Sequence, residues 1–211
     1  MYWILWILIA PWWRLFFPTK IIGKKKLKPL KNKATILSAN HQSLNDPVLI
    51  KAKVKPTSKM MAKDSLFKNW FSKRLMACLG AYPVNREGND LSAVKKTLAY
   101  LKEGKTVTIF PEGTRANAGD LSEMKNGLVM FALKTDSYVV PMIFRKKPKF
   151  LRLNTLVIGE PFKFSEIEEF KGVKVNKEVL ESASKLLSEK MQYLKEVDLK
   201  EYKKSLNTKK M

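Results

Sequence analysis

The chain of 211 residues is 45% hydrophobic, which is ordinary for a globular protein with one sizeable core. Its 41 lysines and arginines against 19 acidic residues give a formal net charge of +22, which favours nucleic acid, an anionic membrane or an acidic carrier protein as the partner. The single cysteine, Cys78, excludes an intrachain disulfide and, with a single histidine, argues against a transition-metal site. We expect a reduced, cytoplasmic-facing protein without a metal or another cofactor.

The first 13 residues are all apolar and contain four of the five tryptophans, Trp3, Trp6, Trp12 and Trp13. A membrane-spanning helix needs about 20 apolar residues, and Pro11 and Arg14 interrupt this run before that length. The run also lacks the basic start and the small-residue cleavage site of a signal peptide. The sequence therefore predicts a retained segment that does not span a membrane.

Tryptophan favours the headgroup region of a bilayer, and the lysines between positions 20 and 33 would attract anionic lipid. We expect residues 1–33 to be a membrane-associating segment with a Trp-rich helix, peripheral or monotopic on the cytoplasmic face of the cell membrane. Trp3, Trp6, Trp12 and Trp13 are its expected membrane contacts. The alternative is a helix packed on its own domain beside a solvated lysine run.

Residues 34–39 predict a buried strand, and Asp46-Pro47 predicts the start of a helix, because proline suits the first helical position. Apolar residues at helical spacing predict a helix over 65–79 that buries Cys78 and ends at Gly80. Residues 81–84 predict the next strand. A helix over 90–102 follows, with Leu91, Val94, Leu98 and Leu101 as its inward stripe.

The C-terminal half continues the alternation, with a strand over 106–110, a helix over 126–134, strands over 138–144 and 153–158, and a long amphipathic helix over 179–194. Strands alternating with helices predict an α/β fold, with a central, mostly parallel or mixed sheet flanked by helices. We expect the main domain to cover residues 34–195. Residues 196–211 form a basic tail whose lysine-rich end we expect to be disordered.

His41 is the only histidine, so a reaction that uses an imidazole base near neutral pH must use this residue. Asp46 lies five positions later, and on one continuous helix the two side chains would point far apart. A turn between the predicted strand and helix would bring them together. Asp46 could then fix the imidazole tautomer, leaving the second nitrogen to take a proton from an attacking alcohol. Otherwise Asp46 caps the helix and His41 is an ordinary loop residue.

A second candidate is the loop Phe110-Pro111-Glu112-Gly113-Thr114-Arg115, which follows a predicted strand. Backbone N–H groups, a hydroxyl and a guanidinium in such a loop can bind a phosphate. Glu112 could order the loop by pairing with a basic residue or could bind an acceptor hydroxyl. The alternative is a surface turn with a solvated Glu/Arg pair.

The segments NHQSLND at 40–46 and FPEGTR at 110–115 together resemble the first and third motifs of the glycerolipid acyltransferase family, especially its bacterial 1-acyl-sn-glycerol-3-phosphate acyltransferases. GAYPVNR at 80–86 resembles the second motif, Val140-Pro141 the fourth, and Lys63 matches a family lysine. The resemblance covers residues 34–160. Pro83, Val84 and Ala116 depart from the usual motif residues, and many relatives have a longer region before the first motif.

The resemblance implies His41 as the base and Asp46 as its orienting partner, with Lys63, Arg86 and Arg115 around the acceptor phosphate. Glu112, Gly113 and Thr114 would shape the substrate pocket. The implied reaction transfers a fatty acyl group from acyl-ACP or acyl-CoA to the sn-2 hydroxyl of lysophosphatidic acid. It gives phosphatidic acid on an anionic membrane surface.

Two alternatives stay open. One is acylation of glycerol 3-phosphate or another lysolipid. The other is a non-catalytic basic protein that binds anionic membrane or nucleic acid, although no specific nucleic-acid motif is present. Charge does not choose between the two acyl donors, because both are acidic. Chain-length preference, oligomeric state and depth of membrane insertion are left open.

Overall fold

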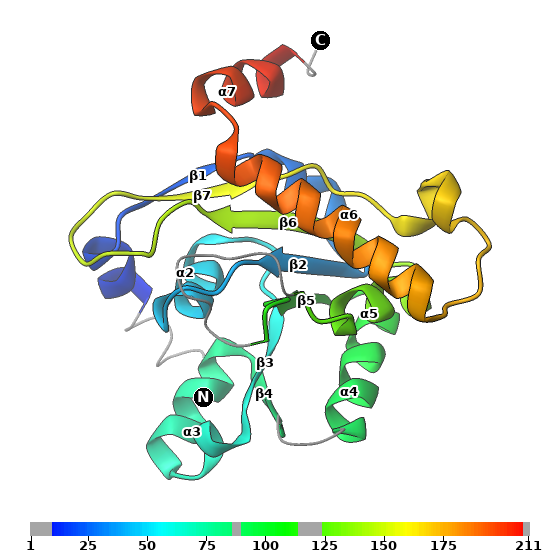
Figure 1. The fold of residues 1–211 in the computed structure, drawn as a ribbon. Coiled ribbons are helices and arrows are strands. Elements are labelled where there is room, and N and C mark those ends of the chain that lie inside the picture. Colours follow the sequence, from blue (N-terminus) through cyan, green and yellow to red (C-terminus); the bar gives the residue numbers. More distant parts are fainter. Residues whose placement is uncertain (1–9, 86–89, 114–123, 209–211) are drawn as a thin grey trace.

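A seven-stranded sheet organises the structure, a computed structural model that describes residues 10–85, 90–113 and 124–208 (Figure 1). The strand order across the sheet is β1-β7-β6-β2-β5-β3-β4. In chain order the strands are β1 (Thr19–Ile22), β2 (Thr35–Ala39), β3 (Lys59–Lys63), β4 (Ala81–Val84), β5 (Thr106–Ile109), β6 (Tyr138–Phe144) and β7 (Asn154–Ile158). Neighbouring strands of this sheet are parallel except for the antiparallel β6–β7 pair, so the predicted mixed α/β sheet is confirmed.

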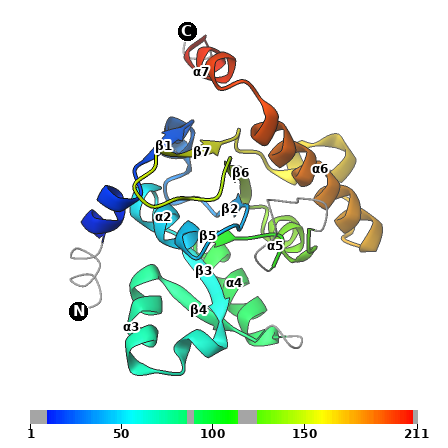
Figure 2. The ribbon, with the colours of Figure 1, turned by 60° about the vertical axis from the view of Figure 1, so that its left-hand side comes forward.

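Helices follow the strands and cover both faces of the sheet (Figures 1 and 2). The α-helices are α2 (Asn45–Lys53), α3 (Trp70–Leu79), α4 (Leu91–Lys102), α5 (Gly127–Thr135), α6 (Lys177–Glu196) and α7 (Leu199–Thr208). Short 3-10 helices are η1 (Lys24–Leu30), η2 (Asp64–Phe67), η4 (Phe164–Glu166) and η5 (Glu168–Phe170). Residues 10–16 are also helical, as predicted for the N-terminal region.

Side chains alternate along the central strands and so divide the interior into two cores. Ile36 and Val139 belong to the core that includes residues of α4, α5 and α6. Their neighbours Leu37 and Val140 belong to the second core, with residues of α2 and η1. Every residue of β2 is buried, which accounts for the continuous apolar run in its sequence.

The N-terminal helix is tied to the end of α2. The Arg14 guanidinium donates to the carbonyl of Ala52 from Nε at 3.2 Å and from Nη2 at 2.7 Å, and Lys53 Nζ donates to the carbonyl of Phe17 at 2.9 Å. A cation at the C-terminal carbonyls of a helix also interacts favourably with the helix dipole. The helix at 10–16 is thus fixed to the domain. Within the described part of the chain, no helix has the length and apolarity needed to cross a membrane.

The helix predicted over 65–79 is wrong in its first part. Residues 64–67 form the short helix η2, and α3 begins afresh with Asn69 as its N-cap, whose Oδ1 accepts from the Ser72 N–H at 2.8 Å. The Asn69 side chain caps the start of a new helix, which interrupts the continuous helix that the apolar spacing predicted. Cys78 is buried, as expected.

The inward stripe predicted for α4 is wrong at Leu91, which is 67% exposed. Asp90 caps the helix by accepting from the Ala93 N–H, and the buried side chains are Ala93, Thr97 and Leu101. Val94 and Leu98 are partly buried at the edge of this face. The face of α4 that packs against the sheet is therefore the one formed by Ala93, Thr97 and Leu101, and Leu91 lies outside it.

Two strands were not predicted. β1 lies within residues 1–33 and pairs with β7 at the edge of the sheet, and β3 lies between β5 and β4. Both segments are short, and lysine is present in each, so neither shows a clear strand pattern. The sheet neighbours, rather than local propensity, stabilise these strands.

The basic C-terminal tail contains the helix α7, where disorder was expected only near its end. Its buried Tyr202 donates from the phenol to the carbonyl of Ile158 at 2.7 Å and accepts from Lys26 Nζ at 2.6 Å. Burial raises the pKa of the Tyr202 phenol. This one side chain therefore joins α7 to the end of β7.

We expect Tyr202→Ala to release α7, because the change removes a buried ring and both hydrogen bonds. In hydrogen-exchange mass spectrometry, the amides of residues 199–204 should exchange at least about tenfold faster, while those of α6 are unchanged. Tyr202→Phe keeps the ring and should show a smaller effect. Equal exchange in Tyr202→Ala and the natural protein would contradict this role.

Candidate active site

The two sequence motifs meet at one edge of the sheet. β2 and β5 are parallel neighbours, and β5 also pairs with β3 in parallel, so these three strands end at the same edge. His41 follows β2, the loop containing Glu112 follows β5, and Lys63 is the last residue of β3. In open α/β sheets, ligand sites commonly lie beyond the carboxyl ends of the strands.

Asn40 fixes the point at which the chain leaves β2. Its buried amide donates from Nδ2 to the Phe144 carbonyl at 3.0 Å, and its Oδ1 accepts from the Phe144 N–H at 2.7 Å. A side-chain amide thus extends the pairing between β2 and β6 by one more residue. The position of the next residue, His41, is set by this bond pair.

Asp46 lies in the first turn of α2 and is fully buried. Its Oδ2 accepts from the backbone N–H groups of Gln42 at 2.7 Å and Ser43 at 2.6 Å, and it lies 3.1 Å from His41 Nδ1. These bonds hold the intervening residues in a tight turn. The turn therefore brings His41 and Asp46 together, where a continuous helix would have separated them.

The Asp46 carboxylate determines which nitrogen of His41 carries hydrogen. An ionised carboxylate can only accept, so the Nδ1···Oδ2 contact requires a hydrogen on Nδ1. The Nε2 atom of the neutral ring is then a lone-pair acceptor. The ring also stacks on Phe110, with 4.3 Å between the ring centroids, and its side chain is 13% exposed. This arrangement is that of an oriented base that can take a proton from an alcohol.

Glu112 joins the two motifs directly. Its Oε2 accepts from the backbone N–H of His41 at 2.9 Å, and the residue is buried. A carboxylate bonded to a backbone N–H makes a strong, charge-assisted hydrogen bond. The loop after β5 is therefore held against the residue that follows β2.

Lys125 is a site residue that sequence reasoning missed. Gly113 has a φ of +71°, and a β-carbon there would lie 2.9 Å from Cδ and Cε of Lys125, so the lysine stem passes over this glycine. The Lys125 N–H also donates to the Pro111 carbonyl at 2.8 Å. The sequence offers only a lone lysine before a helix, which is no signal among so many lysines. Phe110 belongs to the predicted loop, but the stacking of its ring on His41 was not predicted.

Other predicted site residues are exposed, partly buried or outside the described part of the chain. Lys63 is exposed at the end of β3. Trp12 is exposed, whereas Trp13 is partly buried and packs against the second core. The following predicted residues lie outside the described residues: Arg86, Thr114, Arg115, Trp3 and Trp6.

Cys78 is not placed to act as a nucleophile. It is buried in α3, and burial raises the pKa of its thiol, which disfavours the reactive thiolate. No group of three or more His, Cys, Asp or Glu side chains that could hold a metal ion occurs among the residues described here.

Comparisons with known proteins agree with this geometry. Residues 19–145 match the family model described as Acyltransferase. The 1-acyl-sn-glycerol-3-phosphate acyltransferase of Borreliella burgdorferi is 29% identical over 128 residues, which cover 60% of this chain and 51% of that protein. The chain thus spans about half the length of this relative. The protein of the same name from Bacillus subtilis is 29% identical over 152 residues, covering 67% of this chain and 72% of its own length.

A solved structure has the same fold. The crystal structure of the 1-acyl-sn-glycerophosphate (LPA) acyltransferase PlsC from Thermotoga maritima superposes with a TM-score of 0.64 at 27% sequence identity. The match covers 85% of this chain and 73% of that one. The similarity therefore extends beyond the two motifs to most of the described fold.

We expect Asp46→Asn to disturb the tautomer of His41, because an amide can present either a donor or an acceptor to Nδ1. With one histidine in the chain, the imidazole signals in ¹⁵N–¹H NMR spectra need no assignment. The natural protein should show hydrogen on Nδ1, and the variant should lose this preference and about 1–3 kcal/mol of stability. The exposed Asp136→Asn serves as a control and should leave the tautomer unchanged. Hydrogen on Nε2 in the natural protein would refute the arrangement.

Proposed function

Because the chain belongs to the acyltransferase family, we propose that it transfers a fatty acyl group from a thioester donor to the sn-2 hydroxyl of 1-acyl-sn-glycerol 3-phosphate, giving phosphatidic acid. The observation that carries this proposal is the pairing of His41 Nδ1 with the buried Asp46, next to the Glu112 loop. The names of the relatives from Borreliella and Bacillus support the choice of acceptor.

In the proposed reaction, His41 Nε2 takes the proton of the acceptor hydroxyl as its oxygen attacks the thioester carbon. The carbon–oxygen bond forms, the carbon–sulfur bond breaks, and the imidazolium returns the proton to the leaving thiolate. Asp46 holds the ring and stabilises its transient positive charge. The protein forms no covalent intermediate, so only one base is needed.

The acceptor phosphate requires cationic partners near this base. Lys63 ends β3 at the same sheet edge, and Arg86 and Arg115 occupy the matching positions of the resembled motifs. We assign these three side chains to the phosphate, and Gly113 and Thr114 to the wall of its pocket. Glu112 accepts from the backbone N–H of His41, a partner that neither of the two roles considered for it included.

The surroundings of the reaction follow from the substrates. A lysophosphatidic acid acceptor is held in a bilayer, so the proposal places the enzyme on the cytoplasmic face of the cell membrane, with the Trp-rich N-terminal segment in contact with anionic lipid. Acyl-ACP and acyl-CoA are both acidic donors that suit a charge of +22.

We expect His41→Ala to lower the acyl-transfer rate by about 10²–10⁴-fold, because the only imidazole base is removed. The assay measures phosphatidic acid formed from lysophosphatidic acid with each of the two donors. Circular dichroism and vesicle binding should match those of the natural protein. Full activity in this variant would end the proposed role of His41, and absence of turnover in the natural protein with every lysolipid tested would favour a non-catalytic basic protein.

Arg115→Ala should raise the apparent KM for lysophosphatidic acid by about tenfold or more, because a charge-assisted partner of the phosphate is lost. Lys134→Ala, on α5, removes one positive charge at a position not assigned to the site and serves as the control. A KM equal to that of the control would remove Arg115 from the phosphate site.

A further inference from the structure

The loop between β6 and β7, residues 145–153, leaves the sheet beside the candidate active site. β6 is a parallel neighbour of β2. The last residue of β6, Phe144, forms hydrogen bonds with the Asn40 side chain through both its backbone N–H and its carbonyl. His41 follows Asn40 directly. The loop and the proposed base therefore emerge from adjacent strands at the same edge of the sheet.

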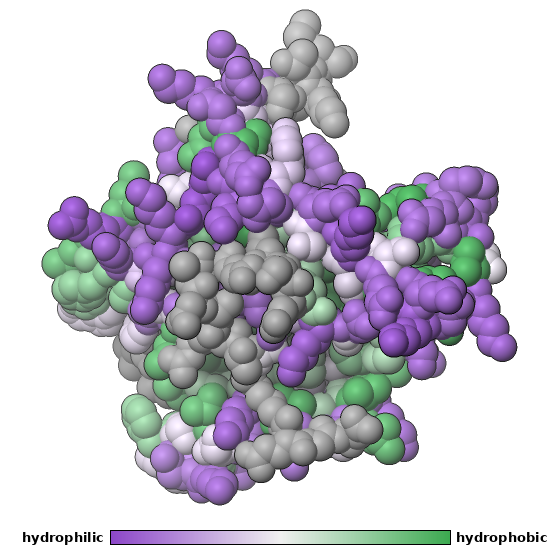
Figure 3. All heavy atoms as spheres, viewed as in Figure 1, coloured by the Kyte–Doolittle hydropathy of each residue, from purple (hydrophilic) through white to green (hydrophobic). Residues whose placement is uncertain are grey.

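The tip of this loop presents apolar side chains to solvent. Leu151 is 63% exposed and Leu153 is 70% exposed, and Leu151 has a φ of +51°, a conformation that is unfavourable for leucine. Figure 3 shows hydrophobic atoms gathered at the left-hand edge of the molecule, where Figure 1 places this loop, with hydrophilic atoms above them. An exposed leucine held in an unfavourable backbone conformation suggests that the exposure serves a function.

Asn154 holds the loop in this shape. Its Oδ1 accepts from the Lys149 N–H at 2.9 Å, and its Nδ2 lies within hydrogen-bond distance of the carbonyls of Lys149, Arg152 and Pro18. The side chain is largely buried, so these bonds are protected from water. The loop tip is therefore preorganised.

The loop also packs on the N-terminal helix. The ring of Phe150 stacks on Phe16, with centroids 5.2 Å apart, and meets Phe17 edge-on at 5.9 Å. The Leu151 N–H donates to the Phe16 carbonyl at 2.7 Å. Trp12 and Leu15 of the same helix are exposed. The two segments thus form one continuous apolar surface.

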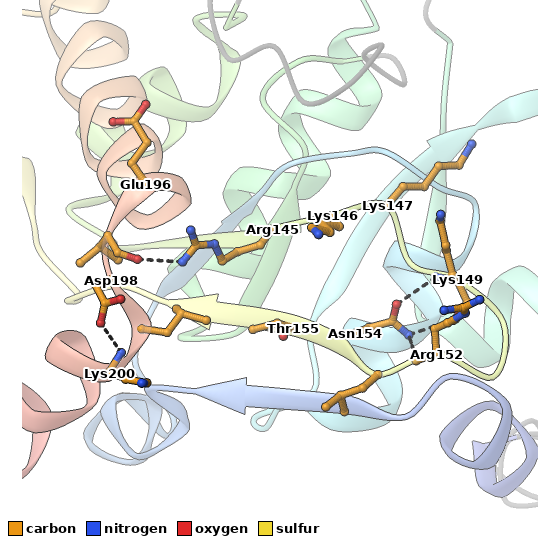
Figure 4. A pocket seen from close by; sticks show the side chains of 13 residues that line it. Arg145, Lys146, Lys147, Lys149, Arg152, Asn154, Thr155, Glu196, Asp198 and Lys200 are labelled. Atoms are coloured by element: carbon orange, nitrogen blue, oxygen red, sulfur yellow. Dashed lines mark hydrogen bonds between the residues drawn. The ribbon is translucent and has the colours of Figure 1, made fainter.

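Cations lie on one side of this surface. A cavity of about 880 Å³ beside the loop is lined by six of them, Arg145, Lys146, Lys147, Lys149, Arg152 and Lys200. Figure 4 shows the carboxylates Glu196 and Asp198 at the α6–α7 end of this cavity, whereas Lys147, Lys149 and Arg152 lie at its other end. Within the described ranges, Lys146, Lys147, Lys149 and Arg152 make no ion pair.

We propose that the β6–β7 loop and residues 10–16 form a single docking face for an anionic bilayer. The exposed leucines of the loop, with Trp12 and Leu15, enter the headgroup region, and the four unpaired cations of the loop bind lipid phosphates. Exposed apolar side chains with cations beside them match an anionic bilayer, in which acyl chains lie beneath phosphates. An acidic protein would match the cations but would leave the exposed leucines uncovered.

This inference rests on the proposed function, because the docking face would bring a membrane-held acceptor to His41. The docking face adjoins the strand end that carries His41, so a lysophosphatidic acid can bring its hydroxyl to the base while its acyl chain stays in the bilayer. The acceptor need not leave the membrane. The membrane contact is thereby extended from the Trp-rich segment to a loop more than 100 residues later in the chain.

The test measures binding of the full-length protein to vesicles of phosphatidylcholine alone and of phosphatidylcholine with phosphatidylglycerol. Leu151→Asn/Leu153→Gln removes the exposed leucines, and asparagine suits the positive φ, so the fold is preserved. Lys146→Glu/Lys147→Glu reverses two charges of the loop. Each variant should bind the anionic vesicles roughly tenfold or more weakly.

Matched control variants change the same kinds of side chain at other positions, so they show whether the effect depends on where the change is made. Leu91→Gln/Val173→Gln removes two exposed aliphatic side chains elsewhere, and Lys171→Glu/Lys174→Glu makes the same change in net charge on the segment before α6. Both controls should bind vesicles within about twofold of the natural protein. With lysophosphatidic acid dispersed in detergent, the loop variants should keep their activity, whereas with vesicle-embedded acceptor they should lose it.

The outcomes distinguish this inference from the proposed function. If the natural protein transfers no acyl group but the loop variants bind vesicles more weakly than their controls, the docking face stands and the enzymatic proposal fails. If acyl transfer is observed but the loop variants bind vesicles like their controls, the docking face is refuted. A loss confined to reactions with acyl-ACP, with vesicle binding unchanged, would also refute it and would assign the cations to the carrier protein.

Discussion

The buried Oδ2 atom of Asp46 is the point on which the proposed site depends. It accepts from two consecutive backbone N–H groups and faces the imidazole, so one oxygen both shapes the turn after β2 and orients the ring. The spacing of five residues is therefore a property of this turn and not of a helix. The carboxylate does not cap α2, since its N–H partners, Gln42 and Ser43, precede the helix, and a longer or shorter turn would not place Nδ1 within 3.1 Å of it.

The arrangement of the sheet converts distant motifs into neighbours. The NHQSLND and FPEGTR segments are separated by α2, β3, α3, β4 and α4, yet β2 and β5 are adjacent and parallel, so both segments leave the same edge. The Glu112 to His41 bond then closes the gap between them. Asn40 makes the corresponding link on the other side, to β6. The proposed base, His41, is thus held from three strands of the sheet.

Much of this was predictable because the signals were local and strong. The apolar run at 34–39, the Asp46-Pro47 helix start and the amphipathic helix ending near Leu194 all appear close to where the sequence indicates. β1 and β3 were missed because their four or five residues are stabilised by sheet partners far along the chain. The helix α7 was not predicted because the lysine-rich composition of the tail indicated disorder. Tyr202 stabilises this helix only through its tertiary hydrogen bonds to Ile158 and Lys26. The stacking of Phe110 on His41 and the path of Lys125 over Gly113 are likewise tertiary contacts without a local signature.

The fixed link between the N-terminal helix and α2 has a consequence for the depth at which the proposed reaction would take place. Arg14 and Lys53 fasten residues 10–17 to the C-terminal end of the same helix whose first turn contains Asp46. α2 is nine residues long, which corresponds to about 13 Å. The helix therefore acts as a spacer of constant length, and whatever height the aromatic segment adopts at an interface also sets the height of the imidazole above it.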